Sequence, residues 1–212
     1  MAPVPVRSHI VPVEWAELAE LQRRFGPIRQ EHVVLAVDSP FLDGEHQRLT
    51  SRGRRAEVCF LLHRGDPEAG VLFHRKRFYP PGAYRLPTGG VQAGEPVLDA
   101  LARELLEETG LVLGQAGVTV DRFLGVLSYE LFHRTQARVH HFATYVFAVR
   151  APAHAVIQTQ DPEEAVEAWV WRPLEALEEL ARALEVLTRE DVRWRHWGRY
   201  RALGHRFILR AW

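Results

Sequence analysis

Three glutamates that a helix would bring together are the residues of this sequence best suited to chemistry. Glu104, Glu107 and Glu108 stand at positions i, i+3 and i+4, so a helix places their carboxylates side by side. Like charges at this spacing repel one another by a few tenths of a kcal/mol per pair. A protein can leave such carboxylates on a solvated face. It can also offset the repulsion with a divalent cation, because clustered oxygen ligands suit Mg²⁺ or Mn²⁺.

A glycine-rich turn before this helix favours metal binding. Gly89, Gly90 and Gly94 let backbone N–H groups approach a phosphate or pack tightly against the helix. Pro96 is predicted as the first helical residue, where its missing N–H is tolerated, and Gly110 as the residue that stops the helix. On a helical wheel the glutamates lie opposite an apolar stripe that we expect to be buried. The stripe consists of Leu98, Leu101, Ala102, Leu105 and Leu106.

The spacing of these residues resembles the complete Nudix box. Gly89 is followed after five residues by Glu95, and after seven more by the run RELLEETGL, which begins at Arg103. The resemblance implies an α/β (α+β) fold, namely an α/β/α sandwich with a mixed β-sheet. It also implies a metal-dependent hydrolase that cleaves a phosphoanhydride bond in a nucleoside diphosphate linked to another group X. Mg²⁺ or Mn²⁺ would neutralise the phosphate charge and activate the attacking water.

The resemblance assigns roles to individual residues of the box. Glu104, Glu107 and Glu108 match the family's metal ligands. Glu104 also matches the general base, although family members differ over which residue takes that role. Arg103 matches a residue that orients the glutamates by a salt bridge. Glu95 matches a position that supports the loop or joins the metal shell through water.

The loop before the helix is expected to face the substrate. Gly89 matches the glycine whose backbone lies near a metal or phosphate, and we place Gly90 and Glu95 among the substrate-binding residues. The chain departs from the family pattern at Thr88, where glycine is common, and at Gln92, where an acidic residue is common. Both positions lie outside the set of metal ligands.

Many family members take a further metal-binding carboxylate from a loop well beyond the box. The segment DPEEAVEAWVW offers Glu163, Glu164 and Glu167. Each of the three could instead be a solvated surface residue. Loop position favours Glu163 or Glu164, since Glu167 leads a predicted strand, and we choose Glu164 as the predicted ligand.

Other candidate substrate-binding residues flank the box. Arg75 and Arg77 lie on either side of Lys76, between a predicted strand and a turn, where they could contact phosphate or ribose or remain solvated. Tyr129 follows the box where the dinucleoside-polyphosphate branch of the family often has a tyrosine. Packing of a strand tyrosine in the core explains Tyr129 equally well.

The composition fits a globular protein and excludes several classes. Of the 212 residues, 47% are hydrophobic and 25% charged, and the formal net charge of zero argues against bulk nucleic-acid binding. Only one of the 27 basic residues is lysine, so we expect arginine to bind most phosphate. No membrane-length apolar run is present, and the lone Cys59 excludes an internal disulfide. We therefore expect a cytoplasmic protein with a nucleotide-type small-molecule substrate, no nucleic-acid partner and no membrane association.

Hydrophobic periodicity predicts the elements that position these residues. The predicted parts are an N-terminal extension with a helix and a strand (1–53), the Nudix domain (54–187) and a basic, aromatic C-terminal helix (188–212). Residues 13–25 predict the first helix, with Trp15 on its apolar face, and residues 57–63 and 71–75 predict two paired strands. The other predicted elements are strands at 32–37, 118–129, 141–149 and 168–171 and a helix at 173–187.

The C-terminal helix has two interpretations. Trp194, Trp197 and Tyr200 recur at helical spacing, which favours a helix that packs its aromatic rings on the core. In the second interpretation some basic side chains of this helix face the active site or a dimer partner and hold a polyphosphate. The residues considered for this role are Arg193, Arg199, His205 and Arg206.

One rival function comes from another class. A non-catalytic Nudix-fold sensor or regulatory protein would bind a nucleotide and report to a partner. Such proteins tend to lose one or more box glutamates, whereas this chain keeps all of them. A homodimer formed through residues 1–53, as terminal extensions can form by exchanging strands, is compatible with catalysis.

Overall fold

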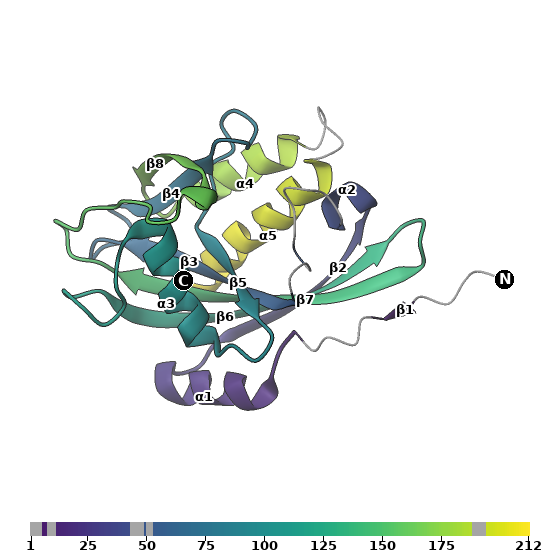
Figure 1. The fold of residues 1–212 in the computed structure, drawn as a ribbon, viewed down its shortest axis with the longest axis horizontal. Coiled ribbons are helices and arrows are strands. Elements are labelled where there is room, and N and C mark those ends of the chain that lie inside the picture. Colours follow the sequence, from purple (N-terminus) through teal and green to yellow (C-terminus); the bar gives the residue numbers. More distant parts are fainter. Residues whose placement is uncertain (1–5, 8–11, 43–48, 50–52, 188–193) are drawn as a thin grey trace.

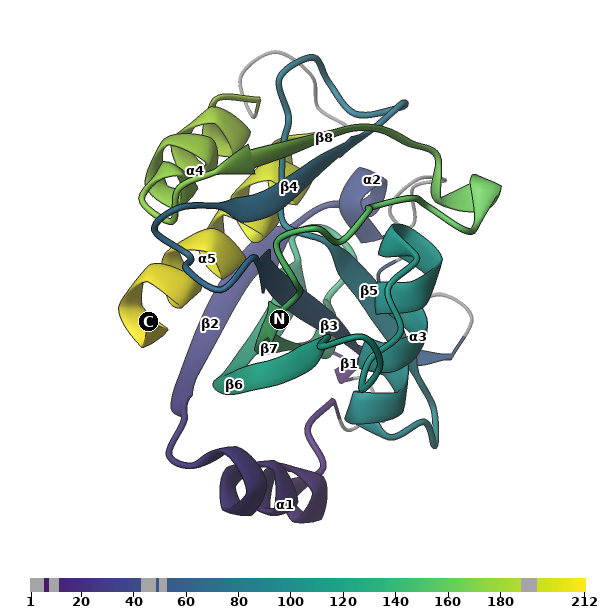
Figure 2. The same ribbon diagram turned by 90° about the vertical axis from the view of Figure 1, so that its left-hand side faces the viewer.

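The computed structural model describes residues 6–7, 12–42, 49, 53–187 and 194–212, and these form a mixed β-sheet with helices on both faces (Figures 1 and 2). The strands are β1 (Val6–Arg7), β2 (Arg29–Val37), β3 (Arg54–His63), β4 (Val71–Lys76), β5 (Thr88–Gln92), β6 (Thr119–His133), β7 (Arg138–Arg150) and β8 (Val166–Arg172). The helices are α1 (Trp15–Phe25), α2 (Ser39–Leu42), α3 (Val97–Thr109), α4 (Ala176–Val186) and α5 (Arg195–Ala211), with a 3₁₀ turn η1 (Pro162–Glu164).

The sheet runs in the order β2-β6-β7-β3-β4-β8, with β1 added beside β7 and β5 beside β3. Strand β3 lies at its centre, parallel to β7 and antiparallel to β5. The predicted pairing of β3 with β4 holds only at the turn, where His63 lies opposite Val71. Beyond that point β4 pairs with β8 instead.

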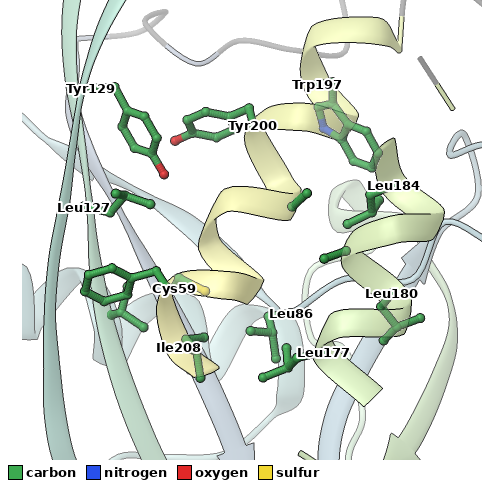
Figure 3. Packing of buried hydrophobic residues seen from close by; sticks show 14 of the residues in the cluster. Cys59, Leu86, Leu127, Tyr129, Leu177, Leu180, Leu184, Trp197, Tyr200 and Ile208 are labelled. Carbon is green, nitrogen blue, oxygen red and sulfur yellow. The ribbon is translucent and has the colours of Figure 1, made fainter. Parts of the chain in front are cut away.

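Helices and alternating side chains divide the apolar core into two halves, one on each face of the sheet. Along β3, Cys59 and Leu61 belong to one half and Val58, Phe60 and Leu62 to the other, as the two-residue period of a strand requires. Helices α1 and α3 cover the half that contains Phe60. Helices α2, α4 and α5 cover the other half, where Figure 3 shows Leu184 of α4 beside Trp197 of α5, and Tyr200 on the sheet side of α5 facing Tyr129.

The N-terminal elements extend the sheet. Strand β2 runs parallel to β6, and Gly125 makes this pairing possible. A Cβ on Gly125 would lie 1.9 Å from the carbonyl oxygen of Arg29, and its φ of +140° is one that other residues rarely adopt. The predicted first helix is confirmed as α1. Trp15, which the helical spacing places on its apolar face, lies at the helix start and is 72% exposed.

The predicted helix that packs aromatic rings at the C-terminus is confirmed as α5. Trp197 and Tyr200 are buried, and the ring of Tyr200 lies 4.7 Å from that of Tyr129 on β6. Residues 188–193, which include Arg193, lie outside the described residues.

Candidate active site

A tight turn joins β5 to α3, the helix that carries the three glutamates of the box. The N–H of Gln92 donates to Glu95 Oε2 at 2.9 Å, and Gly94 adopts a φ of +76° that favours glycine. Pro96 caps the helix in an extended conformation rather than forming its first residue, and Gly110 ends it in the left-handed conformation.

The N-terminal extension also supports this helix. Glu17 of α1 accepts the N–H of Val97, the first residue of α3, at 2.7 Å. The other carboxylate oxygen of Glu17 accepts from Arg55 at 2.8 Å. A carboxylate at this end of a helix satisfies a backbone donor and interacts favourably with the helix dipole.

Arg103 holds the carboxylates of the box in place. Its guanidinium donates to Glu95 through Nε at 2.9 Å and Nη2 at 3.1 Å, and to the carbonyl oxygen of Gly90 at 2.7 Å. Its Nη1 donates to Glu104 at 2.7 Å and to Glu107 at 3.2 Å. The guanidinium of Arg103 therefore links the loop by hydrogen bonds to two of the three glutamates.

Glu104 lies directly against the glycine loop. A Cβ on Gly89 would lie 1.7 Å from the Cδ of Glu104, so no other residue fits at position 89 without moving this carboxylate. Glu104 accepts the N–H of Gly90 at 2.9 Å. Burial raises the pKa of Glu104, and its hydrogen bond from Arg103 opposes that rise.

Glu108 is fully buried at the other end of the acidic face. Within the described residues neither of its carboxylate oxygens has a hydrogen-bond partner; Lys76 Nζ lies 3.4 Å and His74 Nδ1 4.0 Å from its Oε1. Burial raises the pKa of Glu108 from 4.5 to about 8, against the attraction of Lys76. Burial also holds the pKa of His74 well below 6.5, so the imidazole is neutral.

The loop after β7 brings a further carboxylate to this point. Glu164, in η1, pairs with the same Lys76 ammonium that faces Glu108. Burial alone would raise the pKa of Glu164, but Lys76 outweighs it and lowers the pKa. Glu163 lines the nearby cleft, whereas Glu167 turns to Arg75 on β4, at 3.1 Å.

The donor set fits a hard divalent cation, although the described residues do not gather three or more His, Cys, Asp or Glu side chains around a single point. The reason is internal pairing. Arg103 binds Glu104 and Glu107, and Lys76 binds Glu108 and Glu164. All four are oxygen ligands of the kind Mg²⁺ prefers, and the buried oxygens of Glu108 lack hydrogen-bond partners within the described residues. An ion would bind once these side chains leave their internal partners.

A cleft of about 300 Å³ opens beside these carboxylates. Its lining combines acidic, basic and apolar side chains. The acidic lining residues are Glu57, Glu104, Glu163 and Glu164, the basic ones are Arg54, Lys76, Arg85 and Arg201, and the apolar ones are Phe41, Leu49, Phe78, Tyr79 and Trp197. Thr88 and Gly89 complete the lining. Such a cleft can accept a phosphate chain together with a ring system.

None of the five residues predicted to bind substrate lines this cleft. Gly90 and Glu95 accept hydrogen bonds from Arg103 instead. Arg75 pairs with Glu167 instead, and Arg77 is exposed. Tyr129 is 2% exposed and packs in the core beneath α5 (Figure 3). Lys76, which lies between Arg75 and Arg77 in the sequence, lines the cleft instead of them.

Helix α5 contributes cleft residues that the sequence did not single out. Trp197 and Arg201, one turn apart, both line the cleft. Arg201 Nη1 donates to both carboxylate oxygens of Glu57 on β3, at 3.0 and 2.9 Å. Of the basic residues considered for this role, Arg206 pairs with Glu178 and Glu185 of α4. His205 accepts the N–H of Leu86 at 3.3 Å.

Comparison with known proteins decides the family. The family model described as NUDIX domain matches residues 53–194. The chain belongs to the NUDIX domain family. The match confirms the resemblance predicted from the box, and the mixed sheet with helices on both faces confirms the predicted fold class.

Individual relatives match shorter parts of the chain. The NAD-capped RNA hydrolase NUDT12 of Macaca fascicularis is 33% identical over 84 residues, which cover 40% of this chain and 18% of that protein. The m7GpppN-mRNA hydrolase NUDT17 of Danio rerio is 34% identical over 133 residues, which cover 57% of this chain and 42% of that protein. This Nudix chain therefore spans less than half the length of these curated relatives.

A solved structure, that of the E. coli dihydroneopterin triphosphate pyrophosphohydrolase, is also similar. It is 17% identical with a TM-score of 0.45, and the alignment covers 70% of this chain and 95% of that chain. Within the described part of this chain, none of the helices combines the length and apolar character that a membrane crossing requires.

Proposed function

We propose that this Nudix protein is a metal-dependent pyrophosphohydrolase that cleaves a phosphoanhydride bond in a nucleoside diphosphate linked to another group. The observation that carries this proposal is that Glu104 and Glu164 line one cleft together with basic and aromatic side chains, and that Lys76 joins Glu164 to Glu108 of the box. A sensor needs only to bind a nucleotide and has no use for the buried carboxylates of Glu104 and Glu108, which are costly to bury.

In this proposal the residues of the site have separate tasks. Glu104, Glu107, Glu108 and Glu164 hold the metal, which neutralises phosphate charge and activates water when bound. Arg103 fixes the orientation of Glu104 and Glu107 and does not itself touch the substrate.

The proposed substrate is a nucleotide-type small molecule. Arg54 and Arg201 offer positive charge to its phosphates, and the ring of Trp197 lies along the same cleft. Two relatives are named for hydrolysing nucleotide caps of RNA, which supports a nucleotide. The net charge of zero supports a small molecule rather than a long nucleic acid.

Three further properties belong to this proposal. We propose Mg²⁺, or Mn²⁺, as the ion, because all four ligands are carboxylates. We propose a cytoplasmic location, in keeping with a lone, buried cysteine. We also propose a homodimer formed through the N-terminal extension, since Trp15 and Val34 in that extension are 72% and 65% exposed.

The test is formation of nucleotide products, separated by ion-exchange chromatography, with Mg²⁺ and then Mn²⁺ from nucleoside triphosphates, dinucleoside polyphosphates, nucleotide sugars and cofactor pyrophosphates. Glu107→Gln and Glu108→Gln should abolish metal-dependent turnover of the preferred class. Glu167→Gln, which alters a carboxylate on β8 that does not line the cleft, should retain it. No turnover of any class, with nucleotide binding intact and unchanged in the two box variants, would refute the hydrolase and favour the sensor.

A further inference from the structure

Lys76 is the lone lysine of the chain, and it lies between two carboxylates that the proposed function assigns to the metal. We propose that Lys76 is a built-in cation of this metal centre. In the metal-free protein its ammonium takes the place of a divalent ion between Glu108 and Glu164. Binding of the ion releases the ammonium into the cleft, where it binds phosphate oxygens of the substrate. This inference rests on the proposed function and adds a residue to it.

The geometry around the ammonium supports this role. Lys76 is 9% exposed, and its Nζ lies 3.4 Å from Glu108 Oε1 and pairs with Glu164 Oε2. These carboxylates come from α3 and from η1, so one ammonium joins the box helix to the loop after β7. An ammonium is a compact point charge with three donors, and it therefore resembles a bound ion more closely than a guanidinium does.

The backbone directs Lys76 and Glu164 to the same place. The pairing of β4 with β8 shifts register between Arg75 and Lys76, and such bulges redirect a side chain. The next N–H, that of Arg77, donates to the carbonyl oxygen of Ala165 at 2.9 Å. Ala165 ends η1 in the left-handed conformation, so the end of β4 is tied directly to the turn that carries Glu164.

The choice of residue type is informative within this chain. Arginine occupies 26 of the 27 basic positions, including both neighbours of Lys76. The exception is the basic side chain that lies between the buried carboxylate of Glu108 and the partly buried carboxylate of Glu164. A guanidinium would bind both carboxylates through a rigid, planar set of donors. An ammonium on a flexible side chain can be displaced by an incoming ion.

The released ammonium remains within reach of the substrate. Lys76 lines the cleft together with Arg54, Arg85 and Arg201. Exchange of the ammonium for a divalent ion adds positive charge to the carboxylate wall, while the lysine stem, anchored at the end of β4, keeps its charge in the cleft. Lys76 thus supplies positive charge to the carboxylates of the metal-free protein and later binds phosphate.

The lone lysine makes a direct experiment possible. Labelling with an amine-reactive acetylating reagent, quantified by peptide mass spectrometry, reports on this single side chain. We expect slow labelling in EDTA, labelling at least fivefold faster with Mg²⁺, and slow labelling again with Mg²⁺ and methylenediphosphonate, a non-hydrolysable pyrophosphate mimic. A protein carrying Arg182→Lys supplies the reference, because position 182 on α4 is 73% exposed at its side chain and does not line the cleft. The labelling rate at that position should be the same in all three conditions.

Calorimetry of Mg²⁺ binding to the same protein separates the possible failures. Mg²⁺ binding with an unchanged labelling rate at Lys76 would overturn the inference and leave the proposed function intact. Absence of Mg²⁺ and Mn²⁺ binding would overturn both. Faster labelling with Mg²⁺ that the pyrophosphate mimic does not slow would overturn the phosphate-binding step.

A pair of variants tests the competition independently. Lys76→Met removes the internal cation and should tighten Mg²⁺ binding about tenfold, whereas Arg77→Met removes the same charge one residue away, on an exposed side chain, and should change the Kd less than twofold. Equal changes in the two variants would show a general charge effect and refute the competition. If Lys76→Met fails to fold, the labelling of the unaltered protein still tests the inference.

Discussion

Replacement of Glu108 by glutamine should change how the stability of the metal-free protein depends on pH. Burial raises the pKa of Glu108 to about 8 in the folded protein, whereas the unfolded chain has the ordinary value of 4.5. Between these values the folded protein keeps a proton that the unfolded chain has lost. Stability is therefore fully present below about pH 4.5 and is lost as pH rises through about 8.

The magnitude follows from the difference between the two values. A rise from 4.5 to about 8, at about 1.36 kcal/mol per pKa unit, amounts to about 5 kcal/mol. This is an upper limit, because water that enters beside the ionised carboxylate reduces the cost of burial. Even half of it is a large fraction of the roughly 5–15 kcal/mol that stabilises a typical domain.

The assay is urea denaturation in EDTA between pH 5 and pH 9, followed by the fluorescence of the six tryptophans. Glutamine has the shape of the neutral carboxyl and cannot lose its proton. The free energy of unfolding of Glu108→Gln should therefore exceed that of the unaltered protein by an amount that grows with pH and approaches 2–5 kcal/mol at pH 9. Burial also raises the pKa of Glu104. The free energy of unfolding should therefore still depend on pH in both proteins.

Glu107→Gln is the matched control, since its side chain is 34% exposed and the substitution is the same. It should follow the unaltered protein across the pH range. Parallel curves for Glu108→Gln and the unaltered protein would refute the argument that burial of Glu108 controls this dependence.

Three further predictions test the supports of the site. Gly89→Ala should reduce turnover about 100-fold, because its Cβ would lie 1.7 Å from Glu104 Cδ and displace the carboxylate by more than about 1 Å; circular dichroism should show a retained fold. Arg201→Leu should lower the free energy of unfolding in urea by about 3–5 kcal/mol, because it leaves the buried carboxylate of Glu57 without its counter-ion, with the hydroxyls of Thr144 and Tyr200 as its remaining donors, and addition of Glu57→Leu should recover most of the loss. Glu17→Ala should lower the thermal midpoint through a loss of about 1–2 kcal/mol, because it removes the acceptor at the start of α3.

The sequence predicted the box helix well because its spacing constrains one element. It predicted which residues lie together on α3, but not what each side of the helix faces. Leu106 was expected in the buried stripe and is 41% exposed, whereas Glu108, on the opposite side, is fully buried. Both sides of α3 meet the protein, one at the core and one at the cleft, and periodicity alone cannot distinguish a solvent face from a cleft face.

The basic residues at the end of β4 show a second limit. Alternation in a strand places Arg75 and Arg77 on one face and Lys76 on the other, but the sequence does not state which face meets the carboxylates. The register shift after Arg75 adds a local change of direction that has no sequence signal. The contact of Arg201 with Glu57 joins residues 144 positions apart, and pairings at such separation depend on how α5 packs.

Residues near both ends of the chain support or line the site that contains the box. Glu17 caps the box helix from α1, Phe41 lines the cleft from α2, and Trp197 and Arg201 line it from α5. These residues lie outside the region 53–194 that the family model matches. The carboxylates that we propose as metal ligands lie inside that region. Membership of the family thus supports the proposed cleavage of a phosphoanhydride bond, and flanking segments supply part of the cleft that we propose for the group attached to that bond. Selection among Nudix substrates should therefore respond more to changes at Phe41 and Trp197 than to changes in the box.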